Sequence, residues 1–274
     1  QSTCVVPADV PLETADRARL RLALVHCRKP VVTGTFAGPS FEIMRGMLIA
    51  VRGSEEALRR RPLAIFDCCP SPPLAWSELT CAVLVRCAQT GIPAELVSMP
   101  LTGATAPVTL IGALCQHTAE NLSGVVIHQL AGPGSPIIYG GSPAAFDMRH
   151  GTTPMGAIET MMIDAAYAQI GRHLGLPTHA YMGLSDAKSP DWQAGMESGC
   201  GALLATLAGV HVVSGPGMLD FESCQSLEKL VLDNEACAMA LRLARGIRRP
   251  EGGLALDVVR SGIEFTPTRG MRLQ

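Results

Sequence analysis

The sequence has little net charge, few aromatic residues and no long apolar run. Its 274 residues carry a formal net charge of -2, and Lys and Arg gather only in the short stretches 59–61 and 245–249, which argues against a nucleic-acid-binding surface. No apolar run reaches the roughly 18 residues that a membrane-spanning helix needs, and the N-terminus lacks the basic start and apolar core of a signal peptide. We therefore expect a cytoplasmic protein that contacts neither nucleic acid nor a membrane.

The ten cysteines lack the spacing of a metal site. No two of them form a C-x-x-C pair, and no histidine stands at the distance of a zinc partner. The sequence therefore predicts no metal site. Several cysteines lie in apolar helical stretches, where this residue acts as a small hydrophobe, and we expect buried, reduced thiols at Cys81, Cys87, Cys115 and Cys237. The adjacent Cys68 and Cys69 are the one pair of interest.

Short β-rich runs alternate with longer amphipathic runs along the chain, which indicates an α/β fold. Each predicted strand begins about 30 to 45 residues after the previous one, the length of one strand-helix unit. The predicted strands span 30–36, 63–67, 94–99, 136–139, 178–182 and 210–214. Helices are expected near 11–27, 40–60, 76–90, 106–130, 157–174, 191–208 and 224–247.

The turns from helix to strand favour a (β/α)8 TIM barrel. Gly91, Gly175 and Gly209 each end a helix no more than three residues before a strand, and such short turns are typical of the stability face of a barrel. Pro107 is expected in the first turn of its helix. An open doubly wound sheet is the alternative, but no G-x-G-x-x-G follows any strand. Six strands are visible where a closed barrel needs eight, and 250–274 supplies one at most. We expect a single barrel domain over 1–274 that is truncated at both ends.

Large side chains recur where the predicted strands end. Aromatic residues make up only 4% of the chain, so this concentration calls for an explanation. Barrel interiors need large side chains in layers, whereas a site for an organic cation needs aromatic faces around the charge. The sequence leaves both explanations open for Phe36, Phe66, Met99, Tyr139, Tyr181 and Phe221.

Polar residues are expected at the same end of the barrel. Carboxylates there can hold a cation or manage a proton, although Asp and Arg also stabilise loops. The charges of Asp147 and Arg149, and of Asp186 and Lys188, stand two residues apart directly after a strand, which makes these pairs the strongest candidates. The other polar residues in this group are Asp67, Thr102, Thr105, Asp191 and Glu222.

Several ordered motifs resemble those of the trimethylamine methyltransferase family. They are the stretches GATAPVTL at 103–110, AE at 119–120, PGSPIIYG at 133–140, DMR at 147–149, GLP at 175–177, SDAKSPDWQAG at 185–195 and EKLVLD at 228–233. Their order and spacing match the family over roughly residues 5–260. Beyond about residue 261 the chain departs from the expected pattern.

The resemblance implies a TIM barrel whose mouth binds a small methylated amine. The methyl group passes to the cobalt of a separate corrinoid protein, in chemistry related to methanogenesis, and this chain needs no cofactor of its own. Pyrrolysine-containing members take trimethylamine, and members without that residue resemble demethylases of quaternary amines such as glycine betaine, proline betaine or carnitine. This sequence contains no pyrrolysine. The loop 186–191 is the expected place of that residue, with Lys188 at or beside it.

Roles follow from the resemblance together with the strand ends. We expect catalytic roles for Asp147, Asp186 and Lys188, and substrate binding by Phe36, Phe66, Met99, Tyr139, Tyr181, Arg149, Phe221 and Glu222. The expected partners are the corrinoid protein and the methylated amine, and the chain could form a homo-oligomer. Three alternatives stay open: a non-catalytic module that binds betaines or a corrinoid protein, an inactive truncated paralogue, and a barrel enzyme of unrelated chemistry.

Overall fold

A six-stranded parallel sheet is the centre of the computed structural model, which describes residues 6–248 and 254–260. Its strand order, β1-β2-β3-β5-β7-β8, follows the chain, and every neighbouring pair is parallel. The strands are β1 (Val31–Thr33), β2 (Ala64–Cys68), β3 (Ala94–Ser98), β5 (Ile137–Gly141), β7 (Thr178–Tyr181) and β8 (Val212–Ser214). All six predicted strands are confirmed.

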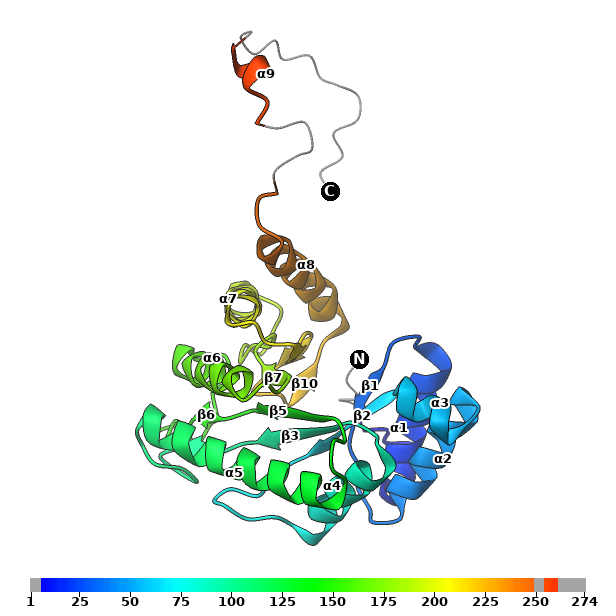
Figure 1. Cartoon of the computed structure of the whole chain (residues 1–274). Coiled ribbons are helices and arrows are strands. Elements are labelled where there is room, and N and C mark those ends of the chain that lie inside the picture. Colours follow the sequence, from blue (N-terminus) through cyan, green and yellow to red (C-terminus); the bar gives the residue numbers. More distant parts are fainter. Residues whose placement is uncertain (1–5, 249–253, 261–274) are drawn as a thin grey trace.

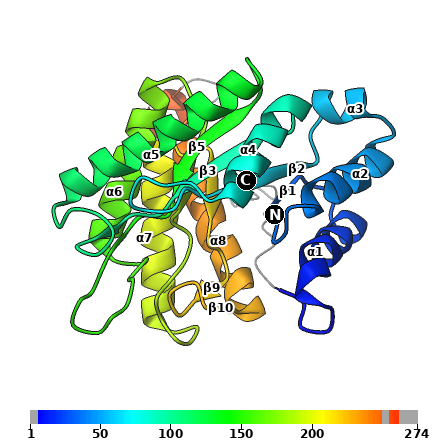
Figure 2. The same cartoon turned by 90° about the horizontal axis from the view of Figure 1, so that it is seen from below.

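All helices but the last line the outer side of the curved sheet in chain order, and the last one lies apart from it (Figures 1 and 2). They are α1 (Leu12–His26), α2 (Ser40–Arg52), α3 (Glu55–Arg60), α4 (Glu78–Thr90), α5 (Leu110–Ala131), α6 (Ile158–His173), α7 (Trp192–Ala208), α8 (Leu227–Ala244) and α9 (Leu256–Arg260). Among the described residues, no helix combines the length and the apolar character needed to cross a bilayer.

The residues at the helix ends explain which predicted helix boundaries are confirmed and which are wrong. Gly91 and Gly209 end α4 and α7 in the left-handed region, with φ of 71° at each, as expected for C-terminal glycines. The single helix predicted over 40–60 is wrong, because Gly53 ends α2 at φ 95° and the hydroxyl of Ser54 accepts from the amide of Ala57 to begin α3. Pro107 also lies outside its helix, since Thr109 caps the N-terminus of α5.

Two small strand pairs were missed by the sequence-based prediction. β4 (Leu101–Thr102) pairs in parallel with β6 (Ala144–Ala145), and β9 (Met218–Leu219) pairs antiparallel with β10 (Cys224–Gln225). Each strand is two residues long, which is too short to show a periodic pattern. These pairs lie in the segments that follow β3, β5 and β8, and they order the chain beyond the carboxyl ends of the main strands.

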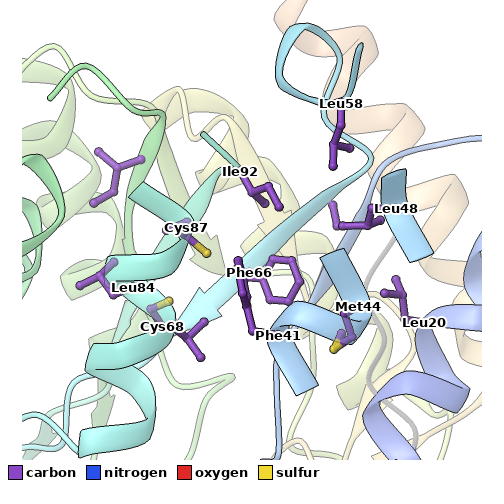
Figure 3. Packing of buried hydrophobic residues seen from close by; sticks show 14 of the residues in the cluster. Leu20, Phe41, Met44, Leu48, Leu58, Phe66, Cys68, Leu84, Cys87 and Ile92 are labelled. Carbon is purple, nitrogen blue, oxygen red and sulfur yellow. The ribbon is translucent and has the colours of Figure 1, made fainter. Parts of the chain in front are cut away.

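The hydrophobic core lies between the sheet and the helices. Phe66 of β2 faces Phe41 of α2 with ring centroids 5.0 Å apart, and Leu20, Met44 and Leu48 complete this packing (Figure 3). Of the cysteines, Cys68 and Cys87 are buried in the same cluster. The described cysteines are all free thiols. The expectation of burial is wrong for Cys115, which is exposed on α5.

The strand order distinguishes between the two α/β architectures. A doubly wound sheet reverses its strand order at a switch point, whereas here each strand lies beside the next one in the chain. The result is a curled half-barrel with its helices outside. Of the stretch 250–274, which was expected to add one strand, the structure describes only 254–260, where it forms α9. The single-domain assignment over 1–274 stays a prediction.

Candidate functional site

Alternation along the strands divides the sheet into a helix-facing side and a concave side. Ala64, Phe66 and Cys68 of β2 are buried against the helices, so Asp67 between them faces the concave side. Residues that are register partners on neighbouring strands face the same side of the sheet, so the side of each residue follows from that of Asp67. The concave side therefore carries Val32, Ile65, Asp67, Glu95, Val97, Ile138, Gly140, His179, Tyr181, Val212 and Ser214.

Asp67 and Glu95 are direct neighbours on the concave side, because they are register partners across β2 and β3. Each carboxyl group influences the pKa of the other. Burial, followed by the charge of Asp67, raises the pKa of Glu95 far above its ordinary value. Burial also raises the pKa of Asp67. Two buried charges of one sign repel strongly at this distance, which favours protonation of one of the two groups.

His179 extends this cluster toward β8. Its Nε2 lies 2.9 Å from Oγ of Ser214, and its Nδ1 lies 3.1 Å from Oε1 of Glu95. Burial lowers the pKa of His179 to about 3, so the ring is neutral and the contact with Glu95 is not an ion pair. Gly140 on β5 leaves room for this approach, because a Cβ there would come within 2.9 Å of Cβ of His179.

Tyr181 and Glu222 bound the cluster at the carboxyl end of the sheet. Tyr181 packs edge-on against His179 with ring centroids 4.9 Å apart. Burial, followed by the nearby charge of Asp67, raises the pKa of Tyr181. Burial, followed by the charge of Asp186, raises the pKa of Glu222 to about 7. Burial thus raises the pKa of several acidic groups on and beside the concave side.

A left-handed turn presents Glu222 to the site. Asp220, Phe221 and Glu222 have φ of 50°, 54° and 69°, a conformation that costs L-residues about 1 to 2 kcal/mol each. Lys188 stabilises the turn, with its Nζ 2.6 Å from Oδ1 of Asp220 and 5.6 Å from the centre of the Phe221 ring. Strain of this kind is concentrated at functional sites.

A cavity of about 720 Å³ lies beside the turn. Asp186 anchors its wall: Oδ1 accepts from the amide of Met155 at 2.9 Å, and Oδ2 accepts from Gly156 at 2.8 Å. Burial raises the pKa of Asp186 to about 6. The lining residues are Asp147, His150, Thr152, Pro154, Ala157, Asp186, Ala187, Lys188, Ser189, Asp191, Gln193, Glu197 and Phe221.

The cavity brings together five of the residues expected from the sequence: Asp147, Asp186, Lys188, Asp191 and Phe221. Oδ2 of Asp147 lies 2.7 Å from Nδ1 of His150, and this contact lowers the pKa of Asp147. Phe221, which lines the cavity, directly precedes Glu222 in the chain, so the cavity lies beside the turn that carries Glu222. Among the described residues, no group of three or more His, Cys, Asp and Glu side chains is arranged to hold a metal ion.

The structure corrects the placement of two predicted site residues. Phe66 and Tyr139 face the helices: Phe66 packs on Phe41, and Tyr139 packs with α6 while its hydroxyl lies 3.3 Å from Thr118 on α5. Because side chains alternate along a strand, their neighbours face the concave side instead. The core explanation therefore holds for both rings.

Three further predicted residues lie outside the cluster and the cavity. Phe36 packs under the guanidinium of Arg19 and lines a separate cavity between α2 and α4. Met99 follows β3 and is exposed. Arg149 is exposed, and its amide donates to Oδ1 of Asp147. None of these three side chains belongs to the concave cluster or to the lining of the cavity beside Asp186.

Sequence analysis missed Glu95, His179 and Ser214, and it named Asp67 without assigning it a role. Glu95 and His179 lie inside strands, whereas the candidates predicted from the sequence lie at or after strand ends. One signal was present, because Glu95 is the one charged residue in the fully buried strand Ala94–Ser98. A charged residue in such a strand is unusual unless it has a partner or a function.

The raised pKa of Glu222 predicts a pH-dependent stability. A folded pKa of about 7 against an ordinary 4.5 means that the folded state holds the proton more tightly. The contribution is therefore complete below about pH 4.5 and is lost as pH rises through about 7. Between about pH 5 and 8, the free energy of unfolding should fall by about 2 kcal/mol more in the parent than in Glu222→Gln. Urea titrations across this range measure it, and parallel pH profiles would contradict it.

Comparison with known proteins identifies the family. The model of the trimethylamine methyltransferase family matches residues 1–264. The chain belongs to this family. It is 40% identical over 207 residues to a trimethylamine methyltransferase of Methanosarcina thermophila, which covers 76% of this chain and 43% of that protein. A glycine betaine methyltransferase of Desulfitobacterium hafniense is 33% identical over 208 residues, with 76% and 43% covered.

Solved structures agree with the fold of this family member. The monomethylamine methyltransferase of Methanosarcina barkeri superposes with a TM-score of 0.60 at 13% identity, covering 88% of this chain and 50% of that one. A dihydropteroate synthase of Yersinia pestis gives 0.53 at 12% identity over 88% and 77% of the two chains. These likenesses concern the fold alone. The chain spans about half the length of the curated relatives it matches.

Proposed function

We propose that this chain forms the substrate-binding part of an enzyme that moves a methyl group from a small quaternary amine to the Co(I) of a separate corrinoid protein. Family membership supports methyl transfer from a methylated amine. The glycine betaine methyltransferase among the relatives, together with the absence of pyrrolysine from the sequence, supports the quaternary class.

The observation that carries the proposal is the position of Tyr181 on the concave side, where it packs on His179, which contacts Glu95, the register partner of Asp67. A quaternary ammonium group has no N–H to donate, so it is recognised by charge and by aromatic faces. Buried carboxyl groups provide the charge, and the ring of Tyr181 provides a face. The same arrangement would suit a phosphate or a carbanion poorly, because the acidic groups would repel it.

The proposed reaction requires the chain to position the substrate cation and to remove water from it. The C–N bond breaks with its electron pair going to nitrogen, the amine leaves neutral, and the two electrons of Co(I) form the new Co–C bond. The permanent positive charge makes the amine a leaving group without a proton. The residues of this chain hold the cation, orient one methyl group outward and exclude water, which is catalysis by orientation and desolvation.

Visible spectroscopy tests this function. The protein, mixed with reduced corrinoid protein and glycine betaine, should convert the Co(I) spectrum to that of methyl-Co(III). Proline betaine, carnitine and choline are run in parallel to define the substrate. Binding of these amines without any spectral change would favour a non-catalytic binding module, and binding of none would contradict the substrate class.

The two tyrosines of the sheet give a matched test of the cation site. Each aromatic face beside a desolvated ammonium contributes about 0.5 to 2 kcal/mol, so Tyr181→Leu should weaken quaternary amine binding by roughly two- to thirtyfold. Tyr139→Leu removes a ring of the same kind from the helix-facing core, and it should lower the melting temperature with little effect on affinity. Calorimetric affinities and thermal unfolding separate the two roles. Equal affinities in both variants would show that Tyr181 only packs.

A further inference from the structure

Asp67 and Glu95 form an acidic pair on the concave side of the sheet. They occupy matched positions on adjacent parallel strands, which lie about 4.8 Å apart. The Glu95 side chain is completely buried. Within the described residues, Oε2 of Glu95 and Oδ1 of Asp67 have no hydrogen-bond partner, and the one polar contact of Oε1 of Glu95 is with Nδ1 of His179 at 3.1 Å. A proton held between the two acids is the simplest way to satisfy such oxygens.

The surroundings of the pair favour retention of that proton. Burial and mutual repulsion raise the pKa of Glu95, and burial, followed by the charge of Asp67, raises the pKa of the Cys69 thiol. The ring of His179 is neutral and cannot balance a second negative charge. His179 of β7 contacts Glu95 directly. Electrostatic interactions reach the pair, or Tyr181 beside it, from Arg19 of α1, whose charge favours ionisation of Asp67, and from Cys69 after β2, Tyr167 of α6 and Glu222.

We propose that Asp67 and Glu95 are specificity-determining residues that share one proton before substrate binds and release it when a permanently charged ammonium group binds beside them. This inference rests on the proposed function for the identity of the cation. An uncharged molecule of the same shape does not release the proton, so it meets a site without full negative charge. The pair thereby selects the charge of the substrate as well as its shape.

The same exchange resets the site after methyl transfer. Once the methyl group has left, the nitrogen is neutral and its attraction for the doubly ionised pair is lost. The pair then takes back a proton from solvent, and the product amine is no longer held by charge. Binding of the cation releases a proton to the buffer, and departure of the neutral amine restores it, so protons and charge balance over the cycle.

Calorimetry measures the exchange directly. Glycine betaine is titrated into the protein at pH 8 in two buffers of different ionisation enthalpy, so that the difference in heat counts released protons. At this pH Glu222, with a pKa of about 7, is already mostly ionised, whereas Glu95 is not. The parent should release between about half and one proton for each glycine betaine bound, and its affinity should rise up to about tenfold for each pH unit between 7 and 8.

Matched variants assign the proton to the pair. Glu95→Gln keeps the size of the side chain but has no proton to release, so both proton release and pH dependence should be lost. Glu222→Gln changes another acid beside Tyr181 and should keep the release. Asp67→Asn is the second variant of the pair if Glu95→Gln fails to fold, and it should reduce the release because the repulsion that retains the proton is gone. As a ligand control, tert-butylacetate, in which carbon replaces the ammonium nitrogen, should release none.

Two results would overturn the proposal. One is binding of glycine betaine to the parent without proton release, or no binding at any pH tested. The other is unchanged release in Glu95→Gln. Methyl transfer to Co(I) is assayed on the same preparations, so that the two hypotheses fail separately. Normal transfer without proton release refutes the pair alone, whereas proton release without transfer refutes the enzyme and leaves the pair as a cation-binding device.

Discussion

Gly201→Ala is expected to destabilise the protein by about 3 kcal/mol or more. Gly201 lies in α7, where a Cβ would come within 1.8 Å of the carbonyl oxygen of Met182. A backbone atom cannot turn aside as a flexible side chain can, so α7 would have to move off the end of β7. Overpacking in a close-packed interior costs about 1 to 3 kcal/mol and occasionally more, and a clash with the backbone belongs at the upper end.

Gly199→Ala is the matched control for this substitution. It lies two residues away in the same helix, and a Cβ there would meet nothing within 4 Å. Alanine is favoured over glycine in a helix interior by up to about 1 kcal/mol, so this variant should be as stable as the parent or more so. Urea unfolding of both variants measures the difference. Equal destabilisation by the two alanines would show that α7 does not pack on Met182 as described.

Lys229→Met is expected to cost about 3 to 5 kcal/mol of stability, the range for breaking a buried ion pair by removing one partner. Lys229 is only 1% exposed, and its Nζ lies 2.5 Å from Oδ2 of Asp233 and 2.7 Å from Oγ of Ser198. The substitution leaves the carboxylate of Asp233 buried without its cation. Since Asp233 also accepts from the amide of Gly217, the loss should loosen α8, α7 and the turn after β8 together.

The double variant Lys229→Met with Asp233→Leu tests the cause of this loss. Removing both charges removes the cost of an unpaired buried carboxylate, so the double variant should be more stable than Lys229→Met alone. Recovery should stop short of the parent, because the amide of Gly217 loses its acceptor. Arg60→Ala, which breaks the exposed pair with Glu56, is the surface control and should change stability little. A double variant no more stable than the single one would contradict the assignment.

The sequence alone predicted the six strands, the helices between them and their parallel order. It could do so because the signals are local: apolar runs of strand length, amphipathic runs of helix length, and glycines where helices end. The family motifs and the loop residues Asp147, Asp186 and Lys188, which line one cavity, came from the sequence for the same reason. Loops that follow consecutive parallel strands meet at one edge of the sheet.

Tertiary structure decided which way each strand residue faces. Side chains alternate at every residue, so an error of one position in a strand moves a side chain from the cavity to the core. For this reason Phe66 and Tyr139 proved to be core residues, while Asp67 beside Phe66 faces the concave side. The meeting of Asp67 with Glu95, 28 positions along the chain, is set by the register of β2 against β3. That register results from packing of the helices on the outer face, which no local pattern in the sequence records.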